Sequence, residues 1–98
     1  MPQQESNIKE RTIYKVPRLY KVIIFNDDVT TMDFVVMILQ KVFHKSEQEA
    51  EKLMLDVHNN GQAVVGIYTF DIAKTKVGQV TMMAQDKGFP LRLVFQPE

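Results

Sequence analysis

The sequence predicts a small α/β two-layer sandwich in which three helices cover one face of a three-stranded sheet, in the order β-α-α-β-α-β. Runs of β-branched and aromatic residues alternate with segments whose apolar residues recur at helical spacing, and Asn, Asp, Gly and Pro separate them. With 98 residues, 45% of them hydrophobic, the chain can form one core but not two. We expect residues 20–98 to form this domain after a flexible, largely polar N-terminal extension over residues 1–19.

The first strand is predicted at residues 19–25, which are β-branched and aromatic and stop at the Asn-Asp-Asp run at 26–28. A helix follows from residue 32 to about Phe43, since a threonine precedes it as a cap and an aspartate lies in its first turn. The Ser-Glu-Gln-Glu run at 46–49 is a capping box, which predicts the start of a second helix.

The second half of the chain follows the same alternation. The second helix should end at the Asn-Asn-Gly run at 59–61, before a strand at 63–68. Thr69 precedes a third helix that should end at Gly88, and a last strand is predicted at 91–95. The third helix is expected to carry the apolar residues Ile72, Val77, Val80, Met83 and Ala84.

Composition excludes several classes of function. The absence of cysteine excludes disulfide frameworks, thiolate metal centres and cysteine nucleophiles. Twelve basic and twelve acidic residues cancel, so the chain lacks the global positive charge that binding to nucleic acids or anionic membranes usually requires. The apolar runs are too short to cross a bilayer, and no secretory signal is visible. We therefore expect a cytoplasmic protein with no nucleic-acid or membrane partner, and no metal or cofactor.

Three adjacent side chains with oxygen atoms, Asn26, Asp27 and Asp28, follow the first strand. They can form an ordinary polar turn, or they can bind a cation. Calcium is disfavoured because its loops spread their ligands over about twelve positions and end with a bidentate glutamate. An ammonium group fits better, since its positive charge and three N–H donors require a few acceptors and one carboxylate.

His58 lies at the end of the apolar stripe of the second helix, one turn after Met54. It is either a histidine at the edge of the core or a functional group. Asp28 and His58 could form the acid/base pair of a small enzyme, but no nucleophile, cofactor motif or oxyanion loop accompanies them. Met32 and Met54 lie beside the polar groups, and their flexible thioethers suit an adaptable apolar pocket. The sequence therefore favours a binding protein over an enzyme.

Several short motifs occur in a fixed order along the chain. They are Tyr-Lys-Val-Ile-Ile-Phe-Asn-Asp-Asp at 20–28, Met-Asp-Phe-Val at 32–35, Leu-Gln-Lys-Val-Phe-His-Lys-Ser at 39–46, Met-Leu-Asp-Val-His at 54–58, Gly-Ile-Tyr-Thr at 66–69 and Thr-Lys-Val at 75–77. In this order they resemble the ClpS adaptor family over residues 19–95. The resemblance implies an adaptor of the N-degron pathway that binds a free α-amino group and a bulky first residue, Leu, Phe, Tyr or Trp. Such an adaptor delivers its substrate to a Clp AAA+ unfoldase-protease.

The resemblance also implies roles for individual residues. The substrate's α-amino group would be bound by Asn26, Asp28 and His58, with Asp27 shaping the loop. The first side chain would enter a hydrophobic pocket, gated by Met32 and lined by Ile24, Thr30, Met32, Val35, Met54, Val57 and Leu91. Asp71 and Lys76 would dock on the N-terminal domain of a ClpA- or ClpC-type unfoldase, and the tail before Pro17 would act during delivery. The alternative is a small α/β interaction domain that recruits a partner through a helix surface, without recognising an N-terminal residue.

Overall fold

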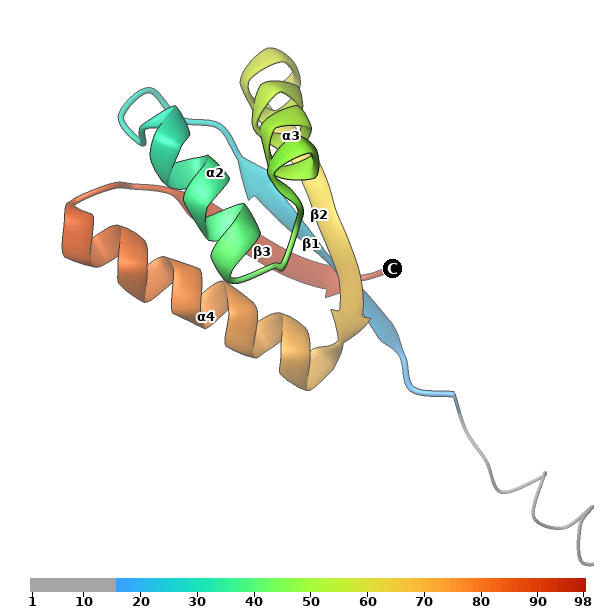
Figure 1. Ribbon diagram of the computed structural model, residues 1–98. Helices are drawn as coiled ribbons and strands as arrows, with labels where there is room; N and C mark the ends of the chain where they lie inside the picture. The colour runs from blue at the N-terminus through green and yellow to red at the C-terminus, as the bar shows by residue number, and fades with distance from the viewer. Residues whose placement is uncertain (1–15) are drawn as a thin grey trace, which may run out of the picture.

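The computed structural model describes residues 16–98, and its elements follow the predicted order. They are β1 (Leu19–Phe25), α2 (Met32–Lys41), α3 (Glu47–Asn60), β2 (Gln62–Thr69), α4 (Phe70–Lys87) and β3 (Arg92–Pro97) (Figure 1). The expected flexible extension, residues 1–19, lies outside the described residues apart from 16–19, and its flexibility stays a prediction. No helix within residues 16–98 is both long and apolar enough to cross a membrane.

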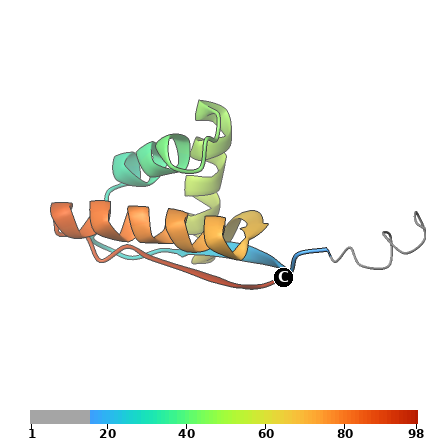
Figure 2. The ribbon, with the colours of Figure 1, turned by 90° about the horizontal axis from the view of Figure 1, so that it is seen from below.

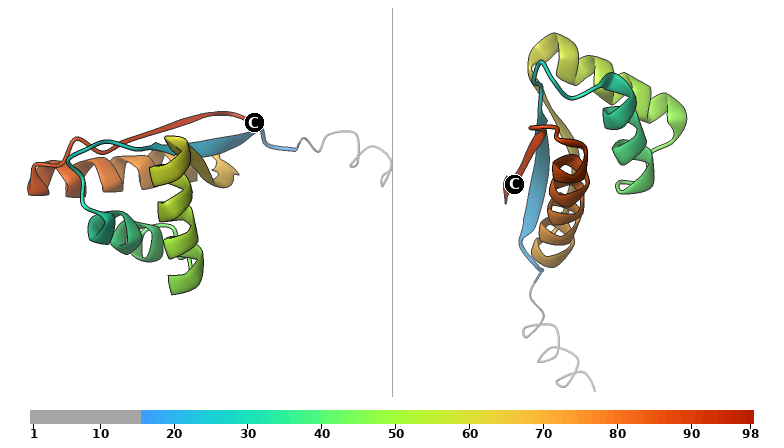
Figure 3. Two further views of the ribbon diagram at one scale, coloured as in Figure 1. Left: turned by 90° about the horizontal axis from the view of Figure 1, so that it is seen from above. Right: turned by 90° about the vertical axis from the view of Figure 1, so that its left-hand side faces the viewer.

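The sheet has the strand order β2-β1-β3, and the central strand β1 runs antiparallel to both neighbours. All three helices lie on one side of it, as predicted (Figures 2 and 3). The register pairs Phe25, the last residue of β1, with Gln62 on one side and Arg92 on the other. The loop that follows β1 therefore leaves the sheet beside the junction between α3 and β2.

Side-chain caps explain where α2 and α3 begin. The Thr31 hydroxyl accepts a hydrogen bond of 3.2 Å from the amide of Phe34, so α2 starts at Met32. Both bonds of the predicted capping box are present, from the Glu49 amide to the Ser46 hydroxyl (3.1 Å) and from the Ser46 amide to the Glu49 carboxylate (2.9 Å). The bond that the Ser46 amide donates to the carboxylate lowers the pKa of the Glu49 carboxyl below its usual value.

The predicted end of α2 at Phe43 was too late, because the helix ends at Lys41. Val42 still has a helical backbone and its amide bonds to the carbonyl of Ile38, but residues 42–43 already form a turn. His44 then adopts a left-handed backbone with φ of 58°, which directs the chain into α3. Val42 and His44, on either side of Phe43, line a surface groove described below.

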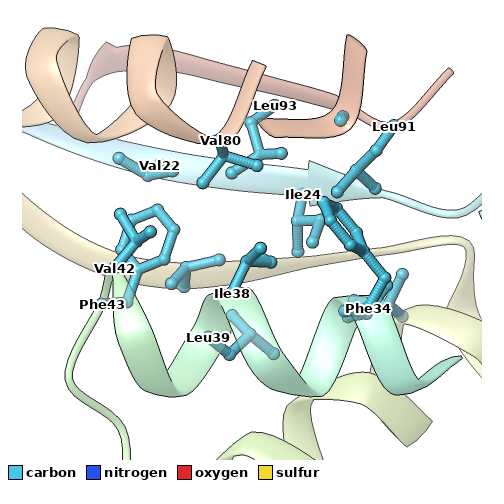
Figure 4. Close-up of a cluster of buried hydrophobic side chains, with 14 of the residues drawn as sticks. Val22, Ile24, Phe34, Ile38, Leu39, Val42, Phe43, Val80, Leu91 and Leu93 are labelled. Atoms are coloured by element: carbon cyan, nitrogen blue, oxygen red, sulfur yellow. The ribbon is translucent and has the colours of Figure 1, made fainter. Parts of the chain in front are cut away.

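Figure 4 shows the core, which lies between the sheet and the helices. Val22 and Ile24 from the inner face of β1 are fully buried, as are Ile38 and Leu39 from α2 and Val80 from α4. Burying a side chain of this size contributes about 1.5–3 kcal/mol. Because α2 is held in this core, its first turn has a fixed position relative to the end of β1.

The apolar residues expected on α4 do not all face the core. Ile72 is 47% exposed, whereas its neighbour Ala73 is fully buried. The buried positions of this helix, Ala73, Val80 and Ala84, are spaced by seven and four residues and so lie on one helical face. Residue 72 is rotated about 100° away from that face, which places Ile72 on the outside.

Candidate functional site

The loop after β1 is organised around the carboxylate of Asp27. Its Oδ1 atom accepts hydrogen bonds from the amides of Val29 (2.8 Å) and Thr30 (2.7 Å), and its Oδ2 atom accepts the Thr30 hydroxyl (2.8 Å). Burial raises the pKa of the Asp27 carboxyl, but these three bonds outweigh burial and leave the pKa below its usual value. Asp27 therefore stays ionised, and its oxygens hold the loop that leads to the cap of α2.

A backbone hydrogen bond joins this loop to the end of α3. The amide of Asn26 donates to the carbonyl of Gly61 over 2.9 Å. Gly61 ends α3 in the left-handed conformation, with φ of 87°, and its own amide bonds to the carbonyl of Val57 over 2.8 Å. His58 lies in this last turn, so the fold brings the loop and His58 together from positions about thirty residues apart.

The electrostatics of this junction suit a positively charged ligand. Asn26, Asp28 and His58 are all exposed, whereas the Asp27 carboxylate is half-buried and bonded to the loop. The carbonyl end of a helix carries a partial negative charge, which stabilises a cation near it. The partial negative charge at the C-terminus of α3 and the carboxylate of Asp28 therefore both favour a cation at this junction. We call Asn26, Asp28, His58 and the Asp27-organised loop the acceptor site.

The residues expected to line the hydrophobic pocket divide into two groups. Ile24, Val35, Val57 and Leu91 are buried and belong to the core cluster. Thr30 and Met54 are half-buried, and Met32 is 47% exposed at the first position of α2. Of the seven, Met32 and Met54 line an open groove between α2 and α3.

This groove, which we call the methionine groove, has a volume of about 700 Å³. Its walls combine three methionines and two other apolar residues with acidic and basic side chains. They are Met32, Asp33, Val36, Met37, Gln40, Lys41, Glu47, Glu51, Met54 and Leu55. Met54 lies one helical turn before His58 on α3, which links one wall of the groove to the helix that carries His58.

A second groove of about 790 Å³, the α4 groove, runs between α4 and the end of α2. Both residues expected to dock an unfoldase line it. The full lining is Lys41, Val42, His44, Asp71, Ile72, Thr75, Lys76, Gln79, Met82, Met83 and Asp86. Lys41 and His44 were not predicted to belong to this surface, since no local pattern in the sequence indicates that the α2–α3 connection lies against α4.

Lys76 and Asp71 differ in what they can offer to a partner. The Lys76 ammonium donates a 2.7 Å hydrogen bond to the carbonyl of Val42, which lies at the C-terminal end of α2. It also lies 5.8 Å from the ring centroid of Phe43 and 5.7 Å from that of Tyr68, whose phenol pKa is raised by burial. Lys76 thus connects α4 to the end of α2 through this hydrogen bond. Asp71, in contrast, is exposed to solvent.

The carbonyl of Gly61 is a part of the site that sequence reasoning missed. The Asn-Asn-Gly run at 59–61 predicted only the end of a helix, which is where Gly61 lies. Its hydrogen bond to Asn26 depends on β1 and β2 pairing at Phe25 and Gln62, a long-range contact without a local signal. Within residues 16–98, no group of three or more His, Asp or Glu side chains is placed to hold a metal ion.

The structure defines a small α/β domain, and comparisons with known proteins give its family. Residues 15–94 match the family model described as "ATP-dependent Clp protease adaptor protein ClpS". The ClpS adapter protein of Deinococcus radiodurans is 57% identical over 89 residues, which cover 91% of this chain and 79% of that protein. The ClpS adapter protein of Acetivibrio thermocellus is 51% identical over 96 residues, covering 98% of this chain and 93% of the relative.

A solved structure agrees with both sequence comparisons. Agrobacterium tumefaciens ClpS2, bound to L-phenylalaninamide, superposes with a TM-score of 0.81 at 41% identity, covering 85% of this chain and all of that one. The chain therefore belongs to the ClpS family of Clp protease adaptor proteins. The family resemblance and the fold class predicted from the sequence are both confirmed.

Proposed function

We propose that this chain binds proteins through their free α-amino group and a bulky hydrophobic first residue, Leu, Phe, Tyr or Trp, and delivers them to a Clp AAA+ unfoldase. The observation that carries the proposal is the hydrogen bond between Asn26 and Gly61, since it assembles the exposed acceptor site at the end of α3. The ligand of the Agrobacterium relative, L-phenylalaninamide, supports it, because that molecule has a free α-amino group and an aromatic side chain. Binding of this kind requires no catalytic group.

The proposed roles at the acceptor site follow from charge and hydrogen bonding. A free α-amino group has a pKa of about 7.7–8.0, so it is mostly protonated at neutral pH. Its three N–H donors match the Asn26 amide oxygen, an Asp28 carboxylate oxygen and an imidazole nitrogen of His58. Asp27 acts through the loop, because its oxygens already accept bonds from Val29 and Thr30.

The first side chain of the substrate would lie beside Met32 and Met54, with Thr30 at the rim and Ile24, Val35, Val57 and Leu91 beneath. Burying a leucine or an aromatic side chain contributes roughly 2–3 kcal/mol, which gives a modest and reversible affinity. Reversibility suits an adaptor, since it must release its substrate to the next protein. Flexible methionines suit several side-chain shapes.

The direct test is an NMR titration with a peptide that begins with phenylalanine. We expect the amide signals of residues 26–31 and 58–61 to shift, because these residues form the acceptor site. Signals from the exposed side of α4, such as those of Thr75 and Gln79, should stay in place. Shifts confined to α4 would contradict the proposal and favour the alternative, an interaction domain that recruits a partner through a helix surface.

For delivery, we propose that the α4 groove docks on the N-terminal domain of a ClpA- or ClpC-type unfoldase in the cytoplasm, with the tail before Pro17 acting after docking. The groove combines exposed Ile72 and Met82 with charged residues of both signs, as an interface with an apolar centre and polar rim would. Asp71 is the residue we expect to contact the partner directly. Lys76 would shape the groove through its bond to Val42.

Substitutions at these two residues should therefore have different effects. Asp71→Lys is expected to weaken capture of the unfoldase by up to roughly fivefold, the scale of one exposed ion pair, and to leave peptide affinity unchanged within about twofold. Lys76→Met removes a charge-assisted hydrogen bond and should lower the free energy of unfolding by about 1.5–3 kcal/mol. Pull-down with the unfoldase and urea unfolding measure the two effects. Equal loss of stability in both variants would contradict this division of roles.

A further inference from the structure

The thioether of Met32 is open to chemical modification at the entrance of the proposed binding site. The chain has six methionines and no cysteine, so thioethers are its only sulfur groups. Among the three that line the methionine groove, Met32 is 47% exposed, whereas Met37 and Met54 are half-buried. Oxidation of methionine follows access of the oxidant to sulfur, which favours Met32 over its two neighbours.

We propose that Met32 is an oxidation site, at which peroxide converts the thioether to a sulfoxide and switches off binding of a hydrophobic first residue. The inference rests on the proposed function, because it requires that Met32 borders the pocket. A sulfur lone pair attacks one oxygen of hydrogen peroxide, the O–O bond breaks and an S–O bond forms. The other oxygen leaves as water after taking up a proton from the first, so sulfur loses two electrons and peroxide gains them.

The position of Met32 explains why this change would affect binding. Met32 is the first residue of α2, directly after the loop that Asp27 holds, and it shares the methionine groove with Met54. A sulfoxide is polar and accepts hydrogen bonds, so an apolar first residue packed against it would leave the new oxygen without a partner. We expect the affinity for a phenylalanine-started peptide to fall at least ~tenfold.

Met82 provides a matched control within the same chain. It is 67% exposed, more than Met32, and it lines the α4 groove rather than the methionine groove. Peroxide should therefore oxidise Met82 at least as readily, without changing the affinity for a peptide bound at the acceptor site. Methionine sulfoxide is reversible by methionine sulfoxide reductases, so oxidation at Met32 would act as a switch and not only as damage.

The experiment measures the affinity for a phenylalanine-started peptide by fluorescence anisotropy before and after hydrogen peroxide treatment, with peptide mass spectrometry to quantify oxidation at each methionine. Wild-type protein should lose affinity at least ~tenfold in step with oxidation of Met32 and recover it after reductase treatment. Each variant is compared with its own untreated form. Met32→Leu should keep its starting affinity after peroxide, whereas Met82→Leu should lose affinity as the wild type does.

Three results would overturn the inference. Met32→Leu could lose as much affinity as the wild type, which would assign the effect to another methionine such as Met54. Wild-type protein with fully oxidised Met32 could bind with unchanged affinity, which would show that the sulfoxide is tolerated. Untreated wild-type protein could fail to bind the peptide at all, and this result alone would also overturn the proposed function.

Discussion

A peptide that begins with phenylalanine is expected to bind at least ~tenfold more weakly after its α-amino group is acetylated. Acetylation removes the positive charge and two of the three N–H donors, so Asn26, Asp28 and His58 can no longer all be paired. The carbonyl end of α3 also loses the cation that its partial negative charge would stabilise. Fluorescence anisotropy with a labelled peptide and its acetylated form measures the difference.

Two further peptides separate the charge from the side chain. A peptide that begins with valine keeps the ammonium group but buries less apolar surface, and we expect it to bind at least ~tenfold more weakly than the phenylalanine peptide. Acetylating the valine peptide should weaken its binding further, since the ammonium group and the first side chain contact different parts of the site. Equal affinities of the free and acetylated phenylalanine peptides would exclude ammonium recognition by the acceptor site.

Asp27→Ala is expected to lower peptide affinity at least ~tenfold, although Asp27 is not predicted to contact the ligand through a free oxygen. The substitution removes the acceptor for three hydrogen bonds from Val29 and Thr30, which fix the loop between Asn26 and the cap of α2. Each such bond contributes about 0.5–1.5 kcal/mol, so the loss of three should also lower the free energy of unfolding by about 1.5–4.5 kcal/mol. Peptide titration and urea unfolding measure both effects.

Asp27→Asn is the matched control, because its amide oxygen can still accept the bonds from the backbone amides of Val29 and Thr30. It loses the negative charge and the second oxygen, which accepts the Thr30 hydroxyl. It should retain most of the stability and affinity that Asp27→Ala loses. If both substitutions reduce affinity equally, the charge of Asp27 matters to the ligand directly and its role in the loop is secondary.

Because the pKa of the Asp27 carboxyl is lowered, the stability of the wild type and that of Asp27→Asn should depend differently on pH. A carboxyl whose pKa is lower in the folded state stabilises the fold above its unfolded pKa, 3.8 here, and the contribution disappears as the pH falls through the folded value. The wild type should therefore lose part of its stability on acidification below about pH 4, and Asp27→Asn should lose less. Identical acid profiles would show that the loop bonds do not depend on ionisation.

Local patterns predicted the elements well, because their ends depend on short-range chemistry. The Ser46 and Thr31 caps and the left-handed Gly61 and Gly88 lie where the sequence indicated. Each feature involves a hydrogen bond or a backbone angle within one helical turn, so neighbouring residues suffice to predict it. The end of α2 was predicted too late because Phe43 is apolar and buried in the turn that follows the helix. Hydrophobicity alone does not distinguish a buried residue in a helix from a buried residue in a turn.

The sequence could not predict contacts between distant segments. Nothing around Lys76 indicates that its ammonium bonds to the carbonyl of Val42, thirty-four positions earlier. The same limit applies to the bond between Asn26 and Gly61, which depends on the pairing of β1 with β2. Motif resemblance suggested that Asn26 and His58 act together, and the fold explains how they could. Their contact with a ligand stays a prediction.

The anchoring of Asn26 on Gly61 has a consequence for which insertions and deletions this domain can tolerate. One residue added between Glu47 and Val57 would turn His58 about 100° around the axis of α3 relative to the preceding turns that pack on α2 and the sheet. A residue added in the connection over residues 42–45 would not rotate His58 in this way, since it precedes the whole of α3 and its cap at Ser46. Length variation among proteins that keep this site should therefore concentrate before α3 and be rare within it.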